Sequence, residues 1–146
     1  MLIFVFLTIA VKAQQANPKY DKAYADSLGA DERGMKMYVL VILKTGPVKI
    51  TDKAANEAIF KGHMDNINRL ASAGKLIVAG PLEKNTKAYR GIFIFNLKTI
   101  EEARLLVDSD PAVKAKVFDA ELFQWYGSAA LPEYLKFQPK IEKQIH

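Results

Sequence analysis

The 146-residue chain contains no cysteine, one tryptophan and only two histidines. Without thiols the protein has no thiolate nucleophile, no disulfide and no thiolate metal site. One histidine is the last residue, His146, so His63 is the only imidazole within the chain, and neither HxxxE nor HxxxH spacing occurs. We therefore expect no metal ion. The chain also lacks a GxSxG turn and a phosphate-binding glycine loop, so we expect neither triad-type hydrolysis nor a cofactor.

The charge pattern argues against a nucleic-acid partner. The 21 Lys and Arg residues exceed the 16 Asp and Glu residues, which gives a net charge of +5, but the charges are scattered in short runs. Aromatic residues do not interleave with basic ones as in RNA-binding surfaces. Half of the residues are hydrophobic and a quarter are charged, which is typical of one globular domain with its own core.

The first thirteen residues, MLIFVFLTIAVKA, form a separate unit. Their apolar run from Leu2 to Val11 has the length of a signal-peptide core and is too short to cross a bilayer as a helix. No basic residue precedes the run, so an uncleaved interfacial anchor remains the alternative, and it is the only membrane contact we expect. We predict a signal peptide over residues 1–13, cleavage before Gln14, and an exported protein that is periplasmic or secreted in bacteria.

The remaining pattern predicts an alternating order of strands and helices. A polar segment over 14–34 is expected to be a linker across the surface, and the tail is 127–146. Asp52 is a predicted helix N-cap, Gly74 follows the same helix, and Thr99 with Glu102 forms a capping box for the second helix. The expected strands are 35–43, 75–82, 89–97 and 116–126, and the expected helices are 52–73 and 99–109.

This β-α-β-β-α-β order predicts an α+β, ferredoxin-like domain over residues 35–126, with two helices on one face of an antiparallel sheet. The third strand is apolar on both faces, because Ile92 and Ile94 alternate with Phe93 and Phe95. The helices cover one face only. Since burying each such side chain stabilises by roughly 1.5–3 kcal/mol, we expect a homodimer in which two sheets pack face to face as a dimeric α+β barrel.

His63 lies within the apolar arc of the first helix, between Ile67 and Leu70 on a helical wheel. Its ring therefore faces the sheet and needs a hydrogen-bond partner. A structural histidine bonded to a backbone carbonyl and a catalytic histidine both satisfy this pattern. Asp110 has a similar double explanation, because an aspartate before Pro111 is also a good helix N-cap.

The chain resembles the YCII-related family of small dimeric domains over about residues 37–125. The resemblance is carried by the order and spacing of KTGP, HMDNINRLASAGKL, AGPL, RGIFIF, EEARLLVDSDPAVKA and FQWY. It implies that His63 and Asp110 are an active-site pair. Some members of the family resemble metal-independent lyases that eliminate a leaving group from cyclic or dienol-type substrates.

These residue types suit acid–base chemistry on a small carbonyl or dienol-type substrate. An imidazole exchanges protons near neutral pH, and a carboxylate beside it fixes the tautomer. Arg90 and the backbone near Gly80 are candidates for holding an oxyanion, and Gly91 allows a close approach. Tyr38 or Trp125 is a candidate aromatic wall, with core packing as the alternative for each. The sequence thus predicts a cofactor-free lyase or isomerase. The alternative is a non-catalytic small-molecule-binding or accessory domain in the periplasm.

Overall fold

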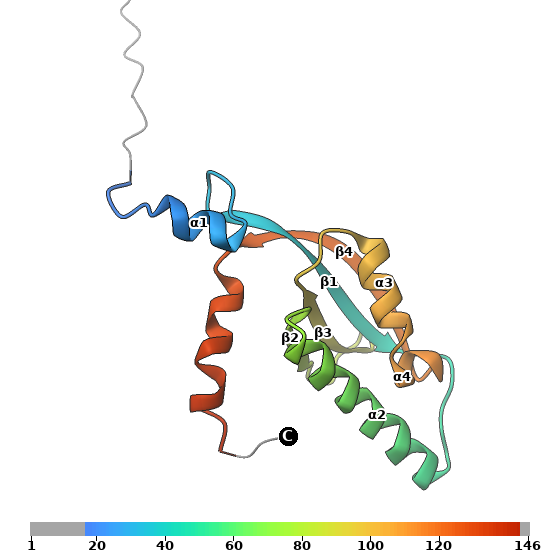
Figure 1. The fold of residues 1–146 in the computed structure, drawn as a ribbon. Helices are drawn as coiled ribbons and strands as arrows, with labels where there is room; N and C mark the ends of the chain where they lie inside the picture. The colour runs from blue at the N-terminus through green and yellow to red at the C-terminus, as the bar shows by residue number, and fades with distance from the viewer. Residues whose placement is uncertain (1–16, 144–146) are drawn as a thin grey trace, which may run out of the picture.

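The computed structural model describes residues 17–143, so the predicted leader lies outside the described residues. Four strands and two main helices follow the predicted order (Figure 1). The strands are β1 (Met35–Thr45), β2 (Leu76–Pro81), β3 (Tyr89–Phe95) and β4 (Phe118–Ser128). The helices within the domain are α2 (Lys53–Ser72), α3 (Ile100–Asp108) and the single turn α4 (Pro111–Lys114).

The strands form one antiparallel sheet in the order β2-β3-β1-β4. β1 is central and pairs with both neighbours, so that Val41 lies opposite Phe93 on β3 and Leu122 on β4. This is the strand order of the ferredoxin-like fold, and the predicted fold class is confirmed.

The predicted helix boundaries follow from local capping. The Asp52 side chain accepts a hydrogen bond from the backbone N–H of Ala55 at 2.7 Å, and Gly74 follows α2 with a positive φ of 66°. The Thr99 hydroxyl accepts from the N–H of Glu102 at 3.2 Å and so begins α3. These caps satisfy backbone donors that the first helical turn leaves free.

The core lies between the sheet and its helices. Val39, Val41 and Leu43 of β1 point to this side together with Phe93 and Phe95 of β3, and all five are buried. Figure 1 shows α2 and α3 on the same side of the sheet. The packing of Leu70, Ala103 and Val107 against these strand residues makes one continuous core.

We call the other side of the sheet the open face. By strand alternation it carries the following side chains: Tyr38, Leu40, Ile42, Ile92, Ile94, Phe123 and Trp125. Glu121 and Asp119 alternate onto the same face of β4, and Glu121 pairs with Lys44 at 2.6 Å. Both acidic residues of β4 therefore lie outside the core.

The segment predicted to be a linker differs from the expectation, because it contains the short helix α1 (Lys22–Leu28). Its start is fixed by Asp21, which accepts from the N–H of Tyr24 at 2.9 Å, and its end by Gly29 at φ 69°. α1 has no buried residue. The helix is therefore stabilised by its caps. It has no apolar face, so the hydrophobic pattern of the sequence did not indicate it.

The C-terminal tail also has structure of its own. It forms two 3₁₀ segments, η1 (Leu131–Lys136), which contacts β2, and η2 (Gln138–Lys140), which packs on η1. The Tyr134 hydroxyl donates to the carbonyl of Ile77, and the Tyr24 hydroxyl donates to Glu133 at 2.7 Å. The tail and α1 are thereby tied to each other and to the sheet edge.

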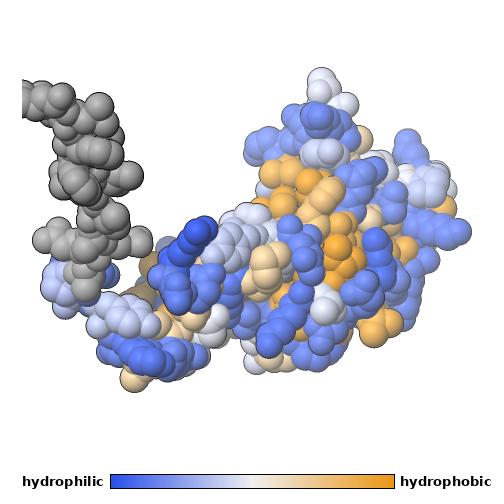
Figure 2. Space-filling model, turned by 90° about the horizontal axis from the view of Figure 1, so that it is seen from above, coloured by the Kyte–Doolittle hydropathy of each residue, from blue (hydrophilic) through white to orange (hydrophobic). Residues whose placement is uncertain are grey.

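Apolar surface gathers over the body formed by the sheet and its helices, with polar side chains around it (Figure 2). Large exposed side chains in the described part of the chain include Leu105 on α3 and Phe123 on the open face, which are 74% and 46% exposed. No helix within residues 17–143 is long and apolar enough to cross a membrane.

Candidate active site

Two helices bring the candidate residues together. His63 lies in the middle of α2, and Asp110 immediately precedes α4. The residue before His63 is Gly62, and a Cβ atom at that position would stand only 3.0 Å from Cγ of Pro111. Because glycine has no side chain, α2 and α4 approach closely at the point where their functional side chains meet.

His63 and Asp110 form a buried pair. Nδ1 of His63 lies 3.0 Å from Oδ1 and 2.9 Å from Oδ2 of Asp110. His63 is 8% exposed and Asp110 is fully buried. The carboxylate, rather than a backbone carbonyl, is therefore the hydrogen-bond partner of this imidazole.

Asp110 receives two further hydrogen bonds. Nδ2 of Asn66 donates to its Oδ2 at 2.9 Å, and the N–H of Ala112 donates to its Oδ1 at 2.9 Å. Burial favours the neutral acid, but the bonds from His63, Asn66 and Ala112 hold the pKa of Asp110 below its ordinary value. Asp110 is thus an N-cap and the partner of His63 at once.

An ionised Asp110 determines the tautomer of His63. A carboxylate only accepts hydrogen bonds, so Nδ1 must carry the proton that lies between the two groups. In the neutral ring Nε2 is then the unprotonated nitrogen. Nε2 makes no hydrogen bond to a described residue, and no buried side-chain nitrogen or oxygen there lacks a partner. Nε2 is therefore open to the adjoining cavity.

The cavity beside His63 has a volume of about 420 Å³ and is mostly apolar. The His63 ring lies 5.3 Å from the ring of Phe118 and 6.0 Å from that of Phe93, measured between centroids. Within residues 17–143, its lining consists of Leu43, Phe60, His63, Met64, Ile67, Ala79, Gly80, Pro81, Arg90, Gly91, Phe93 and Phe118. Its size suits a small organic molecule.

Arg90 is the one cationic side chain among those lining residues. It is exposed at the start of β3, and its guanidinium forms no hydrogen bond or ion pair with the described part of the chain. Nearby, a Cβ at Gly91 would lie 2.8 Å from the carbonyl oxygen of Gly80. Gly91 thus permits close pairing of β2 and β3 at the rim of the cavity.

The structure places the other two predicted residues elsewhere. Tyr38 and Trp125 do not line this cavity but lie opposite each other on the open face, with ring centroids 5.7 Å apart. Tyr38 is fully buried, and its hydroxyl donates to the carbonyl of Ser128 at 2.7 Å. In this chain they pack together, and Phe93 and Phe118 supply the aromatic walls.

Asn66 was not predicted from the sequence. It lies three residues after His63, a spacing that brings two side chains to neighbouring positions on a helix. Its carbonyl oxygen in turn accepts from Arg69 at 2.6 Å. The spacing was visible in the sequence, but nothing indicated that the amide would reach Asp110. No group of three or more potential metal ligands occurs within residues 17–143.

Comparison with known proteins identifies one family. The model of the YCII-related domain matches residues 37–126. Among solved structures, the chain is similar to 5-chloro-2-hydroxyhydroquinone dehydrochlorinase from Burkholderia phenoliruptrix AC1100, in complex with 2,5-dihydroxybenzoquinone. The identity is 23%, the match covers 60% of this chain and 92% of that one, and the TM-score is 0.42. No functionally curated protein matches the chain.

Proposed function

The chain belongs to the YCII-related domain family, and we propose that it is a metal-independent lyase or isomerase acting on a small organic substrate of the carbonyl or dienol type. His63 is the general acid–base of this proposal, and Asp110 is its positioning partner. The proposal rests above all on one observation: both oxygens of Asp110 lie within 3.0 Å of Nδ1, which leaves Nε2 for the cavity.

The first step is proton abstraction from a carbon next to a carbonyl group. Nε2 of His63 takes the proton, the C–H electron pair moves into the enolate, and the ring becomes an imidazolium. Asp110 stabilises that cation through Nδ1 and is itself held by Asn66 and Ala112. This arrangement fixes the base in one orientation before the substrate binds.

The enolate can then react in two ways, and each way accounts for both the electron pair and the proton. In elimination, the electron pair expels a leaving group from the neighbouring carbon, and the proton on Nε2 neutralises the departing anion. In isomerisation, Nε2 returns the proton to a different carbon of the conjugated system. Arg90 at the cavity rim is the candidate for binding the negatively charged oxygen, since charge-assisted hydrogen bonds are stronger than neutral ones.

The walls of the cavity support a substrate with a flat, apolar body. Phe60, Phe93 and Phe118 surround the imidazole. Among the described residues that line the cavity, only His63 and Arg90 have titratable side chains. A low-polarity environment strengthens the electrostatic interaction between a cationic group and an enolate.

Proton exchange tests the proposal without knowledge of the leaving group. The protein is incubated in D₂O with a panel of cyclic ketones, unsaturated lactones and enolisable diketones, and loss of the α-proton signal is followed by ¹H NMR. We expect exchange of at least one compound with the wild-type protein and with His146→Gln, and no catalysed exchange with His63→Asn. Saturable binding with no exchange across the panel would favour the non-catalytic binding domain instead.

A further inference from the structure

The connection between β2 and β3 leads directly to Arg90, the cationic residue of the cavity beside His63. His63 belongs to α2 and Arg90 to β3, so the two residues line the cavity from its helix wall and from its sheet wall. No aspartate or glutamate occurs among the described residues of that lining. The sheet wall therefore carries a cation that no lining carboxylate neutralises.

A β-bulge determines where Arg90 lies. Leu43 and Lys44 are consecutive residues of β1. Their partners on β3 are Gly91 and Tyr89, so Arg90 is an additional residue between the two pairs. Strict alternation along β3 would place Arg90 on the open face. Bulges interrupt alternation and redirect a side chain, and Arg90 lines the cavity together with Gly91.

Both peptide groups that flank Arg90 are held by hydrogen bonds. On one side, Nδ2 of Asn85 donates to the carbonyl of Tyr89 at 2.8 Å, and Oδ1 of Asn85 accepts from the N–H of Tyr89 at 3.2 Å. On the other side, the N–H of Leu82 donates to the carbonyl of Arg90 at 2.9 Å. The backbone at Arg90 is thus fixed before any ligand binds.

Asn85 also holds the turn that precedes Arg90. Its Nδ2 donates to the carbonyl of Glu83 at 2.9 Å, and its Oδ1 accepts from the N–H of Lys87 at 3.1 Å. The chain then passes through Ala88 at φ 57°, a conformation that is uncommon for a residue with a Cβ atom. The side-chain amide of Asn85 therefore stabilises a turn that is unfavourable by itself.

We propose that Asn85 is a positioning residue for Arg90, and that Arg90 selects a small monoanionic substrate over a neutral one. The guanidinium binds the anionic oxygen of the substrate at the cavity rim, through charge-assisted hydrogen bonds. An arginine whose backbone is already fixed loses less freedom on binding than one in a mobile loop. This inference rests on the proposed function for the chemistry at His63, but the binding that it predicts requires no turnover.

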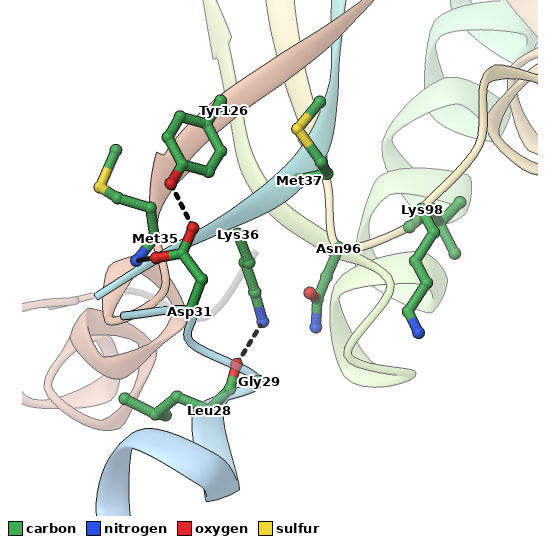
Figure 3. Close-up of a pocket in the computed structure, with 10 residues that line it drawn as sticks. Leu28, Gly29, Asp31, Met35, Lys36, Met37, Asn96, Lys98 and Tyr126 are labelled. Carbon is green, nitrogen blue, oxygen red and sulfur yellow. Dashed lines mark hydrogen bonds between the residues drawn. The ribbon is translucent and has the colours of Figure 1, made fainter. Parts of the chain in front are cut away.

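Benzoate and benzamide are matched flat probes that differ in charge, and the methionines report where they bind. Met64 lines the cavity of His63. Met35 and Met37 line a separate cavity beside Tyr126 (Figure 3). Protein labelled with ¹³C at the methionine methyl groups is titrated with each probe. We expect a saturable shift of the Met64 signal with benzoate, binding of benzamide weaker by about tenfold, and no saturable shift of Met35 or Met37.

Variants assign the preference to Arg90 and not to the charge of the turn. Arg90→Gln is expected to bind benzoate no better than benzamide, and Arg90→Lys to keep part of the preference, because an ammonium lacks the planar fork of a guanidinium. Lys87→Gln removes a cation of the same turn that does not line the cavity, and it should bind both probes as wild type does. Asn85→Ala should weaken benzoate binding several-fold and leave benzamide binding unchanged.

A double-mutant cycle separates positioning from a general effect on folding. If Asn85 acts through Arg90, Asn85→Ala has no further effect on benzoate binding in the Arg90→Gln background. The inference is overturned by the absence of a saturable Met64 shift, by equal affinity of the wild-type protein for the two probes, or by an equal loss of both in Asn85→Ala. Proton exchange of neutral ketones is measured separately, so failure of this inference is distinguishable from failure of the proposed catalysis.

Discussion

Nδ2 of Asn66 lies 2.9 Å from Oδ2 of Asp110, the same oxygen that lies 2.9 Å from Nδ1 of His63. The carboxylate is thereby bound twice by α2, once through the imidazole and once through an amide one helical turn later. Two donors on one helix restrict the rotation of the carboxylate. Asn66 is therefore expected to fix the direction in which His63 points.

Replacing Asn66 with alanine should slow α-proton exchange several-fold without abolishing it, because the bond between His63 and Asp110 remains. We also expect a loss of about 1–3 kcal/mol in unfolding free energy, since Asp110 loses one donor in a buried site. Arg69→Ala removes only the residue that holds Asn66, so its effect should be smaller on both. Equal exchange rates in wild type and Asn66→Ala would show that Asn66 has no positioning role.

Gly62 offers a way to separate geometry from stability. Alanine at this position gains up to about 1 kcal/mol of helix propensity, but its Cβ would meet Cγ of Pro111 at 3.0 Å. We expect Gly62→Ala to leave the unfolding free energy within about 1 kcal/mol of wild type and to reduce exchange by pushing α4 from α2. Gly62→Val, with a larger side chain, should lower both the exchange rate and the unfolding free energy below those of Gly62→Ala. Denaturant unfolding and the exchange assay measure the two effects, and unchanged exchange in both variants would contradict this prediction.

The pKa of Asp110 predicts an acid-dependent part of the stability. The folded-state pKa lies below the ordinary value of 3.8, so the folded protein holds fewer protons here than the unfolded chain at acidic pH. The resulting stabilisation is fully present above about pH 4 to 5 and is lost as the pH falls through the folded-state pKa. Unfolding free energy should therefore fall between pH 5 and 2 more steeply in wild type than in Asp110→Asn.

Asp108→Asn is the matched control for that measurement, because Asp108 is two residues away and its side chain is 56% exposed. Its pH dependence should follow that of wild type. If Asp110→Asn lost stability with acid as steeply as wild type, the ionised carboxylate would not be a stabilising group in the folded state.

The apolar side chains of the open face predict that two copies of the chain form a dimer. Phe123 is 46% exposed there and lies opposite Leu40 on β1. We expect Phe123→Lys to convert the protein from dimer to monomer in sedimentation velocity, because a charged group would be buried between the sheets. Leu105→Lys, at a 74% exposed position on α3, should remain dimeric. A wild-type monomer, or a dimer unaffected by Phe123→Lys, would contradict the face-to-face arrangement.

The sequence was most informative where local rules act. The caps at Asp52 and Thr99 and the left-handed Gly74 predicted where the helices begin and end, and with them the element order and the fold. Each of these signals depends on a few neighbouring residues. By the same logic α1 was recognisable from Asp21 and Gly29, but its lack of an apolar face concealed it.

The site was harder to predict from the sequence, because its contacts join residues that are far apart in the chain. His63 and Asp110 are 47 positions apart, and only the family resemblance paired them. Tyr38 and Trp125 are aromatic and central, yet strand alternation directs them to the open face. Strand parity alone would have excluded them from a cavity that Phe93 lines from the opposite face.

The central claim is that Asp110 holds the proton of a neutral His63 on Nδ1 and leaves Nε2 free to accept one. Long-range ¹H–¹⁵N NMR of the imidazole rings at alkaline pH tests this directly, since it distinguishes a protonated from an unprotonated ring nitrogen. The protein has only two histidines, and His146→Gln assigns the signals. We predict a protonated Nδ1 and an unprotonated Nε2 for His63, with this preference lost in Asp110→Asn. A neutral His63 with its proton on Nε2 would contradict the account, because that nitrogen then has no lone pair with which to take a proton from a substrate.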